Sequence, residues 1–181
     1  DAWVYIIDLE GADFDLIAHG CRAHTSRTRP GLTVDNVLDQ LIADAEPRLA
    51  TLNGDKNVVI SQQMPLLHIL IDGYHRLTAS QWEKVHTMVA EFGKLGVHVT
   101  LLDQVATGKH VTTRPDTLNL CAVRVIFSIA KASDFQQLTD RWPAEGELGL
   151  PRGRAIIEGD GPTRRVQTGW AGDGTSNDPT D

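Results

Sequence analysis

Leu66–Leu77 reads LLHILIDGYHRL, and this segment is the strongest indication of the fold class. Its first half is a short, nearly continuous apolar run that ends in Asp72 and Gly73. A run of this length, closed by turn-forming residues, is typical of a strand buried on both faces of a parallel sheet. We therefore predict a central strand over residues 67–72, with a carboxylate at the point where the strand ends.

Three more apolar runs have the length and flanks of buried strands, namely Trp3–Asp8, Val97–Asp103 and Val123–Ile129. Segments with helical periodicity alternate with them, at residues 34–45, 85–92 and 132–141. Strands that alternate with helices imply βαβ units and a mainly parallel sheet. The chain is therefore predicted to adopt an α/β fold.

Local signals set the ends of these elements. Thr33 is a suitable N-cap for the first helix, Pro47 closes that helix, and Gly96 ends the second. Near the C-terminus, Arg154–Glu158 and Thr163–Gln167 flank a Gly-Asp-Gly-Pro turn and predict a β-hairpin. We expect one domain over residues 1–170 and a disordered tail over residues 171–181, because the tail is short, polar and acidic.

Composition limits the classes of function. The 181 residues carry a net charge of −7, which argues against a nucleic-acid binder that uses its whole surface. Four arginines around the hairpin offer a local basic patch for DNA or a neighbouring subunit, or form a solvated face. The two cysteines are far apart in sequence and predict a reducing compartment. No apolar run approaches a membrane span and no signal peptide is present, so we expect a cytoplasmic protein.

Polar side chains gather at the predicted strand ends. Asp8, Asp72 and Asp103 each close an apolar run, and Gln104 follows the last of them. Ligands bind at the carboxyl ends of the strands in open α/β sheets, and carboxylates there suit Mg²⁺ and phosphate chemistry. The alternative is that these aspartates cap turns, as Asp often does.

Several segments, in order, resemble the part of an FtsK/SpoIIIE-family motor domain that follows its Walker A loop. LLHILIDGYHRL has the form of a Walker B strand, and KLGVHVTLLDQ resembles the next strand with its polar sensor. VYIIDLEGADFDLI precedes them, and TLNLCAVRVIFSIAKASDFQQLTD follows. The resemblance covers Trp3–Trp170. It implies a RecA-like P-loop core with a mainly parallel sheet and helices on both faces, without its first strand and phosphate loop in this chain.

The resemblance also implies roles for single residues. Asp72 matches the Walker B aspartate that holds Mg²⁺ through water, and Gln104 matches the sensor of the γ-phosphate. Asp8 and Asp103 lie beside this nucleotide site. The residues implied at a subunit interface are Asn119, Arg124 and Asp134.

The chain departs from the family pattern at several positions. Gly73 stands where a catalytic glutamate orients the attacking water, Phe135-Gln136 stand where the family has Ser-Arg, and Asp103 replaces a threonine. No GxxxxGK[ST] loop occurs, and we expect such a loop to precede Asp1. Loss of a general base costs about 10²- to 10⁴-fold in rate. His75, two residues after Gly73, is either a side chain that takes the place of the missing glutamate or a surface residue.

Three functions follow from the resemblance. The first is a segment of an ATP- and Mg²⁺-binding motor that translocates DNA in a homo-oligomeric, hexameric ring, with weakened or lost hydrolysis. The second is a degenerate ATPase module of a type VII secretion ATPase that acts on a secreted protein, because such modules often carry an Asp-Gly-aromatic Walker B like residues 72–74. The third is a non-catalytic assembly domain. Any tether to the inner face of the cell membrane lies outside this chain.

Overall fold

The computed structural model describes residues 2–11, 14, 18–28, 31–52, 57–103, 117, 119–159 and 161–167. The chain divides into two compact units. The first comprises Asp1–Val105 and Arg114–Leu120, and the second comprises Ala106–Thr113 and Cys121–Asp181. The predicted sensor Gln104 and the predicted tail lie outside the described residues. Within those residues, no helix is long and apolar enough to cross a lipid bilayer.

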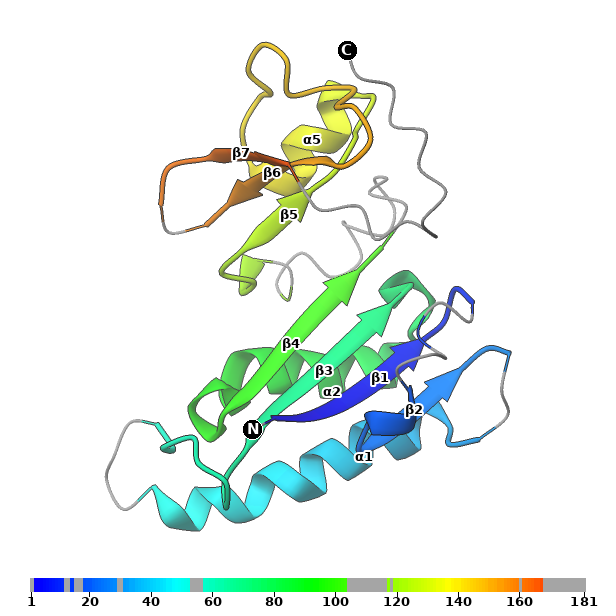
Figure 1. The fold of residues 1–181 in the computed structure, drawn as a ribbon, viewed down its shortest axis with the longest axis vertical. Coiled ribbons are helices and arrows are strands. Elements are labelled where there is room, and N and C mark those ends of the chain that lie inside the picture. The colour runs from blue at the N-terminus through cyan, green and yellow to red at the C-terminus, as the bar shows by residue number, and fades with distance from the viewer. Residues whose placement is uncertain are drawn as a thin grey trace. The chain divides into compact units, whose positions relative to one another are not determined.

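A four-stranded parallel sheet is the centre of the first unit (Figure 1). Its strands are ordered β2-β1-β3-β4, with β1 at Ala2–Asp8, β2 at Ala23–Ser26, β3 at Leu66–Asp72 and β4 at Val97–Leu102. The predictions of β1, β3 and β4 are confirmed. The sequence did not indicate β2, because its four residues, Ala-His-Thr-Ser, have no apolar pattern.

Two helices, α1 (Val34–Ala45) and α2 (Ala79–Glu91), pack against one face of this sheet (Figure 1). Each begins with a capping box, in which the N-cap threonine and the third helical residue satisfy each other's backbone N–H groups. The N-caps are Thr33, as predicted, and Thr78. Short 3-10 helices extend both helices, η2 at Glu46–Thr51 and η4 at Phe92–Leu95, the latter closed by Gly96 in the left-handed conformation.

The core of the first unit lies between this face and the two helices. It is built from alternate strand residues, because successive side chains of a strand point to opposite faces. Ile7 and Ile71 are register partners and both are fully buried in this core. The next residues along the two strands, Asp8 and Asp72, therefore project from the other face of the sheet at its C-terminal edge.

The second unit has its own antiparallel sheet, ordered β5-β6-β7. Its strands are β5 (Arg124–Ile126), β6 (Arg154–Glu158) and β7 (Arg164–Gln167), with α5 at Ala132–Thr139. The predicted hairpin is confirmed as β6–β7, and the short helix is confirmed as α5. A small core joins these elements, formed by Ile126, Phe135, Leu150 and Ile156.

One strand prediction is wrong. Val123–Ile129 was expected as a buried strand of the parallel sheet, but only residues 124–126 form a strand, and β5 pairs antiparallel with β6. Three of its apolar residues are largely exposed, with exposed fractions of 60% for Val123, 50% for Val125 and 53% for Phe127. An apolar run marks a strand, but it does not reveal which neighbour the strand pairs with or in which direction.

The α/β fold with a mainly parallel sheet and a C-terminal hairpin is confirmed. Helices were expected on both faces of the parallel sheet, whereas the helices that the structure describes in the first unit, α1 and α2, both pack on one face.

Candidate functional site

The C-terminal edge of the parallel sheet holds a row of four register partners from four strands. Across the sheet these are Ser26, Asp8, Asp72 and Leu102. Asp103 follows directly after β4. Parallel strands end at a common edge, so the three aspartates predicted from the sequence are brought to the same edge, where α/β proteins bind ligands.

Asp72 ends β3 and is 7% exposed. Backbone hydrogen bonds fix the chain on both sides of it. The Leu9 N–H donates to the Asp72 carbonyl at 3.0 Å, and the Gly73 N–H donates to the Leu102 carbonyl at 3.0 Å. The described residues contain no group of three or more metal-ligating side chains. A site with one carboxylate ligand fits Mg²⁺, which keeps most of its waters and needs few protein ligands.

Asp8 is fully buried, and its carboxylate organises the loop after β1. Its Oδ1 accepts the Gly11 N–H at 2.8 Å, and its Oδ2 accepts the Phe14 N–H at 3.5 Å. A buried carboxylate needs such donors. These contacts are those of a turn-capping aspartate, and a contact between Asp8 and nucleotide remains a prediction.

Gly73 adopts a left-handed conformation, with φ 70° and ψ 38°. It precedes the 3-10 helix η3 (Tyr74–Arg76) and turns the chain sharply away from the strand end. A Cβ atom added to Gly73 would lie 2.8 Å from the Cγ of Glu10 and 2.9 Å from its Oε1. These distances are too short for a real contact, so the glycine makes room for the Glu10 side chain.

Glu10, on the loop after β1, belongs to an ion-pair chain that links three strand ends. Arg76 holds its carboxylate with two bonds, Nε to Oε1 at 2.9 Å and Nη2 to Oε2 at 3.2 Å. The Nε2 of His75 lies 3.5 Å from Oε1 of Glu10, and its Nδ1 lies 2.9 Å from Oδ2 of Asp103. The hydrogen bonds from Arg76 hold the pKa of Glu10 below its usual value and raise that of Arg76.

Sequence reasoning missed Glu10 as a site residue. Its main partner, Arg76, is 66 positions away in the chain, so no local pattern connects them. His75, named only as an alternative, is placed between two carboxylates by the same geometry. Asp103 forms a hydrogen bond with His75. A role for Asp103 beside nucleotide remains a prediction.

The three residues implied at a subunit interface belong to different units. Asn119 is in the first unit, whereas Arg124 and Asp134 are in the second. The Nη1 of Arg124 donates to the Leu138 carbonyl, which ties β5 to α5. Asp134 lies in the first turn of α5, where a negative charge favours the helix. Their part in an interface remains a prediction.

The departure at Phe135 has a structural reason. Its side chain is fully buried in the small core of the second unit, and the Arg141 guanidinium lies 4.9 Å from its ring centroid. A serine at this position would remove the largest side chain from that core. Gln136, the next residue, is exposed.

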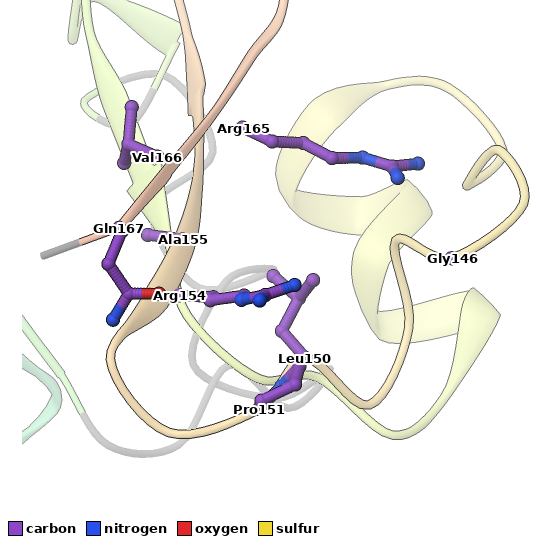
Figure 2. A pocket seen from close by; sticks show the side chains of 8 residues that line it. All are labelled: Gly146, Leu150, Pro151, Arg154, Ala155, Arg165, Val166 and Gln167. Atoms are coloured by element: carbon purple, nitrogen blue, oxygen red, sulfur yellow. The ribbon is translucent and has the colours of Figure 1, made fainter. Parts of the chain in front are cut away.

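Two arginines of the hairpin border a cavity of about 280 Å³ in the second unit (Figure 2). Arg154 and Arg165 line it together with apolar side chains that include Leu150 and Val166. Arg165 also donates to the carbonyl of Glu145. The predicted basic patch is therefore partly used to hold the neighbouring loop in place.

Acid is expected to weaken the second unit through Glu147. This carboxylate is 5% exposed and accepts two bonds from Arg141, at 2.7 and 3.0 Å. Those bonds lower its pKa from the ordinary 4.5. A carboxyl whose folded pKa is depressed contributes stability that is present above its unfolded pKa and lost as pH falls through the folded pKa.

Urea unfolding at about pH 6 and about pH 3 measures this loss. We expect Glu147→Gln to remove part of the pH dependence of the second unit. Glu145→Gln, a neighbouring exposed change, is the control and should leave the dependence unchanged. An unaltered pH profile in Glu147→Gln would contradict the expectation.

Solved structures resemble the chain, although no family model and no curated protein sequence matches it. EssC (ATPases 2 and 3) from Geobacillus thermodenitrificans has a TM-score of 0.75 at 14% identity, covering 97% of this chain and 34% of that one. The cytoplasmic domain of the Thermomonospora curvata type VII secretion ATPase EccC has a TM-score of 0.70 at 15% identity. The match covers 93% of this chain and 22% of the EccC chain. The pCW3 conjugation coupling protein TcpA, solved with ATPγS, has a TM-score of 0.69 at 17% identity. The match covers 92% of this chain and 51% of the TcpA chain.

These matches concern the fold. The chain spans about a third of the EssC structure, about a fifth of the EccC structure and about half of the TcpA structure. All three neighbours are FtsK/SpoIIIE-like P-loop ATPases. The chain therefore has the fold of a RecA-like P-loop ATPase domain.

Proposed function

We propose that this chain is part of a nucleotide-binding ATPase module in which hydrolysis is slow. The observation that carries the proposal is the pair Asp72-Gly73. Asp72 retains a carboxylate at the end of the central strand, whereas Gly73 turns left-handed and offers no side chain to orient water. Phosphoryl transfer depends on positioning and charge stabilisation, so binding and catalysis separate when only the water-orienting group is lost.

Several residues at the C-terminal edge of the parallel sheet would together bind the nucleotide and its Mg²⁺. Asp72 would hold Mg²⁺ through water, and the ion supplies charge neutralisation at the phosphates when bound. Asp103 and Gln104 would lie beside the γ-phosphate, with Asp8 holding the loop next to them. The phosphate loop itself would come from protein outside this chain.

We further propose that the module belongs to a coupling ATPase of protein secretion. Two of the three structures above, EssC and EccC, supply this argument, because EccC is described as a type VII secretion ATPase and both give TM-scores of 0.70 or more. The Asp-Gly-Tyr sequence at residues 72–74 supports the same choice. The module would act in the cytoplasm, in a hexameric ring to which Asn119, Arg124 and Asp134 contribute contacts.

DNA translocation is the second candidate. It is favoured by the similarity to TcpA, a conjugation coupling protein. The net charge of −7 places any DNA contact in a local patch, such as the arginines of the β6–β7 hairpin. The two candidates differ in what stimulates the ATPase, since a translocase responds to double-stranded DNA and a secretion module responds to its protein substrate.

The proposal is tested by nucleotide binding in the full-length protein. We expect a fluorescent ATP analogue to bind with Mg²⁺, and Asp72→Asn to weaken Mg²⁺-dependent binding about tenfold, the equivalent of ~1.4 kcal/mol. Asp39→Asn, a change of an exposed carboxylate on α1, is the matched control. Absence of binding by the wild-type protein, or equal binding by Asp72→Asn, would refute the proposal.

A further inference from the structure

A carboxylate occupies the space that Gly73 leaves open. The Glu10 side chain reaches from the end of β1 to the end of β3, so that its Cγ and Oε1 lie 2.8 and 2.9 Å from the position that a Cβ atom of residue 73 would take. β1 and β3 are neighbours in the sheet, with Asp8 opposite Asp72. At the C-terminal edge of the sheet, position 73 after β3 therefore has no carboxylate, and the Glu10 carboxylate from the end of β1 lies beside it.

Glu10 is available to a water molecule. Its side chain is 18% exposed, and a carboxylate offers about four acceptor positions. Arg76 uses two of them, and the Nε2 of His75 approaches one oxygen at 3.5 Å. Acceptor capacity therefore remains on Oε2, while the ion pair holds the carboxylate in one place.

We propose that Glu10 is the water-orienting carboxylate of this module and that Arg76 positions it and restrains it. The inference rests on the proposed function. In the hydrolytic step, the water oxygen forms a bond to the γ-phosphorus and the bond from that phosphorus to the bridging oxygen breaks. The water proton passes to Glu10 and then to solvent, leaving nucleoside diphosphate and phosphate. Hydrolysis is slow because the pairing with Arg76 lowers the basicity of Glu10.

This arrangement makes Glu10 and Gly73 a matched pair. A side chain at position 73 and the observed position of Glu10 exclude each other, since the added Cβ would lie within 2.9 Å of two Glu10 atoms. A water-orienting carboxylate can therefore be supplied from position 10 or from position 73, but not from both in this geometry.

The test compares Glu10→Gln with Arg76→Gln in the full-length protein. Both substitutions break the same ion pair, so a merely structural role would change hydrolysis in the same direction in both. We expect opposite directions. Glu10→Gln should lower single-turnover ATP hydrolysis by about 10²-fold, the lower end of a general-base effect. Arg76→Gln should raise hydrolysis several-fold, because Glu10 is released from the ion pair.

Two further readouts separate this inference from the proposed function. The dissociation constant of the fluorescent ATP analogue should change less than about twofold in either variant, and the double variant should hydrolyse ATP as slowly as Glu10→Gln. If the wild type binds nucleotide and Glu10→Gln hydrolyses at an unchanged rate, Glu10 is not the water-orienting group. The same conclusion follows if neither the wild type nor Arg76→Gln hydrolyses ATP. If the wild type binds no nucleotide, the proposed function and this inference both fail.

Discussion

Glutamate or alanine at Gly73 is expected to destabilise the first unit rather than to restore a motor. Residue 73 has φ 70°, a conformation that costs a residue with a side chain about 1 to 2 kcal/mol. The contact with Glu10 adds to this cost, because the added Cβ would lie 2.8 Å from the Glu10 Cγ. We expect Gly73→Ala to lower the free energy of unfolding by about 1 to 3 kcal/mol and Gly73→Glu by at least as much.

Chemical denaturation measures the free energy of unfolding of each variant. Two controls separate the contribution of backbone strain from that of the contact with Glu10. Gly93→Ala is the matched glycine control, because an added Cβ there meets nothing within 4 Å and Gly93 is exposed. The double variant Glu10→Ala with Gly73→Ala removes the steric contact and leaves the backbone strain. Its loss should be smaller than the sum of the two single losses. If the loss in the double variant equals the sum of the two single losses, the contact with Glu10 does not contribute to the destabilisation.

Alanine at Phe135 is expected to unfold the second unit. Phe135 is fully buried, and among the described residues the core cluster around it has three other buried members, Ile126, Leu150 and Ile156. Truncation of a buried phenylalanine costs about 3 to 5 kcal/mol. A core this small has little else to replace that burial, and the contact with the Arg141 guanidinium is lost as well.

Amide hydrogen exchange distinguishes the units in the same sample. We expect Phe135→Ala to remove protection in β5, β6 and α5 while β1, β3 and β4 keep theirs, because each unit has a core of its own. Phe127→Ala is the matched control, since that ring is 53% exposed and its truncation should change stability by less than about 1 kcal/mol. Equal loss of protection in both units would show that they unfold together.

The serine that the family pattern places at position 135 is expected to have the same effect as alanine. It would put a small hydroxyl where the structure has a buried ring. This departure therefore reflects the packing of the second unit, whereas the departure at Gly73 concerns the candidate site.

Local sequence alone predicted the elements that short-range physics controls. Thr33 and Asn36 are three residues apart and cap α1, and Gly96 ends the α2–η4 segment because it tolerates a positive φ. The central strand was equally evident, since a buried strand needs a run of apolar side chains. The convergence of the strand-end aspartates then followed from the parallel direction of the strands.

Features that depend on distant partners became evident only in the folded structure. The polar strand β2 exists because its backbone pairs with β1, and Val123–Ile129 contributes a strand to a separate antiparallel sheet because β6 is its partner. The placement of Glu10 over Gly73 is of the same kind. Residue types and spacing specify what a segment prefers, but pairing direction and side-chain contacts between remote segments are settled by which surfaces meet when the chain folds.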